Sequence, residues 1–230
     1  MDLASLPYQT YVTELNILNL PQNLLKAYIM RKTVFYVILI AAVAPSFSFA
    51  LEPLEAVRQN VEKGIRVLED PRYEDASHKQ EQLQILREIM QQTYDFEEFS
   101  RKVLGSSWYK FSQPQRTEFV NVFSEFLKKF YLGKLQDRYS GQKVNFLKQQ
   151  MISNSRALVE IEVTWKKLNV PLTLRMTNRS GKWKVYDLSA VGINAVSNYR
   201  AQFKSMLDKE SPQQIIARLK KKIAELDAKT

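Results

Sequence analysis

The sequence predicts an α+β fold in which helices cover one apolar face of an antiparallel sheet of about four strands. Three observations support this prediction. Apolar residues recur every three to four positions from residue 52 to 139, alternate with polar residues from 144 to 189, and return to the helical spacing after Gly192. Because elements of one kind follow one another, helices and sheet should form separate layers.

The first half of the chain is predicted to be helical. A helix over 52–69 has apolar positions three and four apart, at Leu54, Val57, Val61, Ile65 and Leu68. A second helix over 77–92 has Ser77 as its expected N-cap, with Gln80 three residues later. Asp95 and Glu98 match a capping box that opens a short third helix, which Gly105 ends.

The strongest helical pattern covers residues 113–139. Ser112 and Gln115 suit its N-cap and N3 positions, and Pro114 suits the first turn. Bulky side chains then line one broad face: Phe119, Phe123, Phe126, Leu127, Phe130 and Tyr131. Such a face packs a core or lines an apolar ligand site, and the pattern alone leaves both interpretations open.

From residue 144 to 189 the period is two. Strands are expected from Val144, over 156–166, over 170–177 and over 182–189, with a turn at 178–181. Their short connections predict an antiparallel meander with one apolar face. Two helices follow. The first has apolar residues at Val196, Tyr199, Phe203, Met206 and Leu207. The second is capped by Ser211-Pro212 and has a basic side at Arg218, Lys220, Lys221 and Lys222.

The N-terminal region predicts export. Met30 is followed by two basic residues, an apolar run over 34–44 and small residues that end at Ala50. This order is typical of a cleaved secretory signal peptide. The alternative is a membrane anchor, but an 11-residue apolar run is too short to cross about 30 Å of hydrocarbon. We therefore expect a signal peptide over 30–50, cleaved after Ala50, a single domain over 51–230, and a leader over 1–29 that comes from an over-long gene prediction.

Composition restricts the chemistry. The chain has no cysteine, one histidine and six glycines, which excludes thiol catalysis and the usual zinc sites and leaves no glycine-rich phosphate loop. His78 lies among polar residues, so we expect it at the surface. The net charge of +10 suits anionic lipid headgroups, acidic partner proteins or a solvated basic surface. Nucleic acid is not expected as the partner of an exported protein. We expect no catalytic residue, cofactor or metal site.

Two carboxylate positions are candidates for acid–base chemistry. Glu160 and Glu162 share the polar face of one strand, which is typical of a solvated sheet. Asp187 has the inward register of Trp183 and Val185, so it could act as a buried base. A structural role is favoured, in which Asp187 caps the neighbouring turn over 192–195 or pairs with an arginine such as Arg200. The residues thus favour binding over catalysis, with an apolar ligand between helices and sheet.

Several blocks of residues resemble the MlaC family, the toluene-tolerance auxiliary proteins. The blocks are 181–187 (GKWKVYD) with Gly192-Ile193, 198–203 (NYRAQF), Asp95-Phe96 with 101–105 and Trp108, and Pro114-Gln115-Arg116 with Phe119, Phe123 and Leu127. The resemblance covers about residues 52–227. Asn194 stands where many relatives carry serine, and both residues suit a helix N-cap.

The resemblance implies a periplasmic phospholipid carrier with a nuclear-transport-factor-like core and added N- and C-terminal helices. Its implied partners are an inner-membrane ABC transporter with a substrate-binding ring and an outer-membrane lipoprotein–porin complex, and we expect a monomer. The expected lipid pocket combines the apolar sheet face with facing aromatic side chains. These residues are Val159, Ile161, Val163, Leu172, Leu174 and Trp183 on the sheet, and Phe123, Phe126, Tyr131 and Tyr199 on the helices. The alternatives are an adaptor that binds no ligand and an enzyme with Asp187 as its base.

Overall fold

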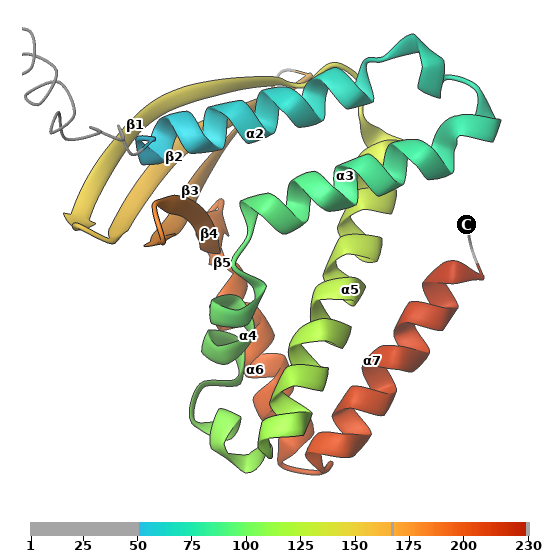
Figure 1. Ribbon diagram of the computed structural model, residues 1–230, viewed down its shortest axis with the longest axis vertical. Coiled ribbons are helices and arrows are strands. Elements are labelled where there is room, and N and C mark those ends of the chain that lie inside the picture. The colour runs from blue at the N-terminus through green and yellow to red at the C-terminus, as the bar shows by residue number, and fades with distance from the viewer. Residues whose placement is uncertain (1–50, 167, 229–230) are drawn as a thin grey trace, which may run out of the picture. The chain divides into compact units, whose positions relative to one another are not determined.

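The computed structural model describes residues 51–166 and 168–228 (Figure 1). The leader and signal peptide predicted over residues 1–50 lie outside the described residues. The α-helices are α2 (Pro53–Leu68), α3 (Lys79–Thr93), α4 (Phe96–Leu104), α5 (Gln113–Arg138), α6 (Ala195–Leu207) and α7 (Pro212–Asp227). Short 3-10 turns lie at Pro71–Tyr73, Ala76–His78 and Gly105–Lys110.

Most helix starts follow the predicted caps. Ser112 and Ser211 form capping boxes at α5 and α7, and Asn194 caps α6 by accepting a bond from the Ser197 amide. The prediction for Ser77 was wrong, because α3 begins at Lys79. Asp75 accepts a hydrogen bond from the Ser77 amide at 2.8 Å and caps a 3-10 turn instead. Because Ser77 lies inside this 3-10 turn, it cannot be the residue that precedes the α-helix.

The sheet is an antiparallel meander in the order β1-β2-β3-β4-β5. Its strands are β1 (Lys143–Ser153), β2 (Arg156–Trp165), β3 (Leu168–Arg179), β4 (Lys182–Ala190) and the two-residue β5 (Ile193–Asn194). The four long strands agree with the prediction, and β5 adds a short edge. Paired positive φ angles at Ser180-Gly181 and at Val191-Gly192 give the tight turns that join β3 to β4 and β4 to β5.

One face of the sheet is apolar, as the alternation predicts. Ile161 pairs with Phe146 on one side and with Leu172 on the other, and Val159 pairs with Leu174. Helix α2 lies along this face over β1 and β2, whereas α4 and α6 meet the sheet near β4 and β5 (Figure 1). The apolar core therefore has a sheet part under α2 and a helical part among α4, α5, α6 and α7.

A register shift in β4 changes which residues face the core. Met176 pairs with Val185, but Arg175 pairs with Asp187, so Tyr186 is an extra residue in the ladder. A bulge of this kind reverses the facing of the residues that follow it. Leu188, opposite Leu174, therefore joins the apolar face. Asp187 is buried, as expected, but the prediction that it shares the register of Val185 was wrong, because the alternation ends at the bulge.

Candidate functional site

The apolar face of the sheet is buried at one end and open at the other. Val159 is completely buried and Leu174 is nearly so. Towards the turn between β2 and β3 the same face becomes accessible, with Trp165 39% and Leu168 64% exposed. Ile193, which pairs with Ala190 across the turn between β4 and β5, is 66% exposed. The surface therefore offers an apolar ligand a continuous path from solvent to the buried core.

Helix α2 covers the first two strands of this face. Its Ala56 and Val57 are buried against the sheet. The Arg58 guanidinium lies 4.3 Å from the centre of the Phe146 ring. The backbone amide of Leu54 donates to Gln149 Oε1 at 2.7 Å. These contacts fix α2 over β1, so a ligand on the sheet face would share that face with α2.

The aromatic face of α5 packs into a separate helical cluster. Phe123 is completely buried, and its ring centre lies between 5.1 and 5.9 Å from four other rings, those of Phe99, Phe119, Tyr199 and Phe203. Phe126 stacks on Phe123 at 6.5 Å. These distances are typical of well-packed aromatic cores. At Phe123 the core interpretation therefore has direct structural support.

Three tyrosines lie where the helical cluster approaches the sheet. The hydroxyls of Tyr131 and Tyr199 are 3.0 Å apart and join α5 to α6. Tyr94 packs against both the helical cluster and the sheet cluster. Burial raises the pKa of Tyr94 to about 12, with a smaller contribution from Tyr131, and burial also raises the pKa of Tyr199. The hydroxyls of Tyr94 and Tyr199 are therefore protonated at neutral pH and can donate hydrogen bonds.

The structure thus places the ten predicted site residues in two groups. Val159, Ile161, Leu172, Leu174 and Trp183 pack in the sheet cluster, and Val163 follows them on the same face towards the open end. Phe123, Phe126 and Tyr199 pack in the helical cluster, and the half-exposed Tyr131 joins it through Tyr199. Tyr94, which the sequence pattern did not single out, connects the two groups.

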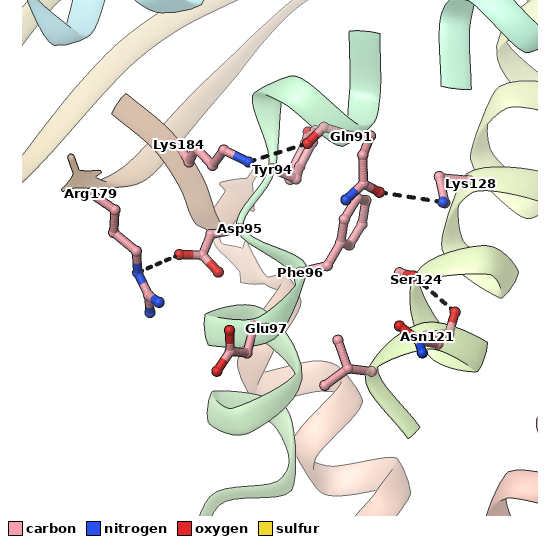
Figure 2. Close-up of a pocket in the computed structure, with 11 residues that line it drawn as sticks. Gln91, Tyr94, Asp95, Phe96, Glu97, Asn121, Ser124, Lys128, Arg179 and Lys184 are labelled. Atoms are coloured by element: carbon pink, nitrogen blue, oxygen red, sulfur yellow. Dashed lines mark hydrogen bonds and ion pairs between the residues drawn. The ribbon is translucent and has the colours of Figure 1, made fainter. Parts of the chain in front are cut away.

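A cavity of about 520 Å³ lies between α3, α4, α5 and the sheet edge (Figure 2). Its walls are largely polar. They include Tyr94 and Phe96 but also five charged side chains: Asp95, Glu97, Lys128, Arg179 and Lys184. Lys128 and Lys184 each donate to an oxygen of Gln91 at 3.4 Å. The volume is in the range of small-ligand sites, but the lining differs from the expected apolar pocket.

A buried carboxylate next to this cavity binds the helices to the sheet. Asp95 caps α4 as predicted, but the side chain of Glu98 does not complete the capping box. Glu98 instead accepts hydrogen bonds from Arg101, Arg156 and Arg179 at 2.7, 3.2 and 3.3 Å. Burial alone would raise the pKa of Glu98, but Arg101, Arg156 and Lys102 hold it below the ordinary value.

Asp187 has the structural role that the sequence favoured. Its two carboxylate oxygens accept from the Asn194 side chain at 2.6 Å and from the Val196 amide at 3.1 Å, so it holds the start of α6. Arg175 lies 3.7 Å away. The pairing with an arginine is therefore made by Arg175 and not by Arg200, which donates to the Lys102 carbonyl. His78 is exposed in a 3-10 turn, as expected.

Metal clusters and membrane-spanning helices are both absent from the part of the chain that the structure describes. Within residues 51–166 and 168–228, no three histidine, cysteine, aspartate or glutamate side chains are grouped so that they could hold a metal ion. In the same described segments, no helix is both long and apolar enough to span a membrane.

The fold and the partly open apolar face define a class of α+β proteins suited to holding an apolar ligand against a sheet. The comparisons with known proteins agree with that class. The family model of the MlaC protein matches residues 58–221, and the chain belongs to the MlaC family. This confirms the resemblance that the sequence blocks suggested.

Individual relatives agree with the family assignment. The intermembrane phospholipid transport system binding protein MlaC of Haemophilus influenzae is 28% identical over 124 residues, which cover 51% of this chain and 57% of that protein. A phospholipid-binding protein of Ralstonia solanacearum, solved in complex with a phospholipid, has a similar fold, with a TM-score of 0.65 at 20% identity. That match covers 76% of this chain and 99% of the solved chain.

Proposed function

We propose that this protein is a periplasmic phospholipid-binding carrier. The observation that supports the proposal best is the apolar sheet face, which runs from the buried Val159 to the exposed Leu168 and Ile193. A face of this kind can hold acyl chains at its buried end and leave the polar headgroup in water at its open end. Membership of the MlaC family and the names of its relatives support a phospholipid as the ligand.

The energetics explain why such a carrier is needed. Exposing two acyl chains of about 30 methylene groups costs on the order of 20 kcal/mol at about 0.8 kcal/mol per group. Free diffusion of a phospholipid through water is therefore negligible. A bilayer stabilises the chains to a similar degree, so release has to be coupled to docking, and the direction of transport is set by the partners.

The proposal includes the route and the lipid site. We propose export by a signal peptide over 30–50 and shuttling between an outer-membrane lipoprotein–porin complex and an inner-membrane ABC transporter with its substrate-binding ring, which maintains outer-membrane lipid asymmetry. We propose that the ten predicted residues line or border the lipid site. Five of them are partly exposed and therefore need the least rearrangement to meet a ligand: Phe126, Tyr131, Val163, Leu172 and Tyr199.

Val163→Trp tests the lipid site directly. Val163 is half-buried on the apolar face, so a larger ring fills ligand space with little overpacking of the core. We expect purified wild-type protein to carry phospholipid in native mass spectrometry and the variant to carry much less, at an unchanged melting temperature. Leu147→Trp is the matched control, because Leu147 is exposed at a register shift of β1.

The result also separates the carrier from an adaptor. A wild-type protein without lipid would contradict the carrier proposal and favour a ligand-free adaptor. The basic side of α7, on which an adaptor would depend, is largely engaged within the chain. Arg218 pairs with Glu210, Lys220 with Glu118 and Lys222 with Glu225.

A further inference from the structure

Two turns at the open end of the sheet, one before β3 and one after β4, present exposed apolar side chains. Trp165 ends β2 and Leu168 begins β3, whereas Val191 lies between β4 and β5 and Ile193 begins β5. We call these four residues the hairpin patch. Trp165 pairs with Leu168, and Ile193 with Ala190, which in turn pairs with Leu172, so these positions belong to the apolar face. Val191 lies in the tight turn itself.

The backbone at Val191 is strained. Its φ angle is +48°, a left-handed conformation that β-branched residues rarely adopt. Asparagine followed by glycine is the preferred pair in such a turn, and Gly192 already occupies the second position. Val191 is also 70% exposed, so packing does not explain its presence. A strained and exposed valine points to a surface that is used for binding.

The charge around the hairpin patch identifies the class of surface that it fits. The segments 163–171 and 188–196 contain no aspartate or glutamate. Lys166 lies over the Trp165 ring at 5.3 Å, and Lys143 pairs in register with Thr164 beside the same turn. Neither lysine makes an ion pair among the described residues. Tryptophan and aliphatic side chains beside lysines that make no ion pair are typical of surfaces that insert into the interface of an anionic bilayer.

We propose that the hairpin patch contacts the surface of an anionic bilayer, with its apolar side chains in the interface and Lys143 and Lys166 at the headgroups. This inference goes beyond lipid binding, because it concerns the surface through which the protein meets a membrane. The patch continues into the proposed lipid site, since Leu172 lies on the same face beside Ala190. Contact there would place the open end of the site against the bilayer.

Co-flotation of the purified protein with vesicles tests the proposal. Vesicles of phosphatidylethanolamine and phosphatidylglycerol should bind the wild-type protein, and added salt should weaken the binding. Leu168→Ser and Val191→Asn should each weaken it about tenfold, because each removes a side chain that the interface would bury. Val191→Asn should also raise the melting temperature, since asparagine suits the turn. A variant that is more stable but binds vesicles less well shows that the loss of binding is not caused by unfolding.

Ile152→Ser is the control, because Ile152 is 58% exposed near the turn at the opposite end of the sheet. Its binding should equal that of the wild type. A wild-type protein that carries phospholipid but does not float with anionic vesicles would overturn this inference. The hairpin patch would then bind a protein partner, and the carrier proposal would still stand. Flotation of a protein that carries no lipid would support the inference and contradict the carrier proposal.

Discussion

Replacing Glu98 by glutamine should destabilise the fold substantially. Glu98 is 1% exposed and lies within 3.5 Å of four cations, Arg101, Lys102, Arg156 and Arg179. Glutamine keeps the size of the side chain and removes its charge. Breaking a buried ion pair costs about 3–5 kcal/mol. The partner side chains are 34–52% exposed, so water screens part of their attraction to Glu98. The expected loss in the free energy of unfolding is therefore about 1.5–3 kcal/mol.

Thermal unfolding followed by circular dichroism measures this cost. For a domain of this size, such a loss lowers Tm by about 4–10 °C. Glu97→Gln is the matched control, because Glu97 is the preceding residue in the first turn of α4 but is exposed and makes no ion pair among the described residues. If both variants melt at the same temperature at pH 7, the ion-pair argument fails.

The pH dependence of the melting temperature is a second test of the ion-pair argument. The pKa of Glu98 is lower in the folded protein than in the unfolded chain, so its charge stabilises the fold above the unfolded value of about 4.3. This contribution is lost as the pH falls from there through the lower folded pKa. The difference in Tm between wild type and Glu98→Gln should therefore be constant near neutral pH and shrink below about pH 4.3.

Two further substitutions test the division between core and site. Phe123→Ala removes the central ring of the helical cluster and should cost about 3–5 kcal/mol in urea unfolding, whether or not lipid is bound. Asp187→Asn weakens the charged acceptor for the Val196 amide and should cost about 1–2 kcal/mol, measured in the same way, without changing the lipid content. A stable Phe123→Ala variant that has lost its lipid would instead show that Phe123 lines the lipid site rather than borders it.

The sequence predicted the features that depend on near neighbours. The caps at Ser112, Asn194 and Ser211 each involve a partner three residues away, and the helix end at Gly105 needs only a residue that tolerates a φ of +53°. The alternation in β2 and β3 likewise predicts their apolar face, because side chains on a strand alternate strictly. Local pattern therefore accounts for most of the fold.

The features that the sequence did not predict depend on distant residues. Glu98 has the spacing of a capping box, but its side chain pairs with Arg156 and Arg179, which are 58 and 81 residues further on. The alternation of apolar and polar residues does not reveal that Tyr186 is an extra residue in β4, and yet this residue moves Asp187 off the apolar face. The cavity beside Tyr94 has walls from α3, α4, α5, β3 and β4, so no spacing along the chain could have revealed it.

The separation of the two clusters bears on how a lipid would enter. Four rings already pack around Phe123, so an acyl chain could reach this residue only by breaking aromatic pairs that each contribute about 0.5–1.5 kcal/mol beyond their buried area. At Leu168 and Ile193 the apolar surface already faces water, so covering it gains free energy without disrupting the packing of the core. Entry from the open end of the sheet is therefore favoured. The chains would then advance along β2 and β3 towards the buried Val159.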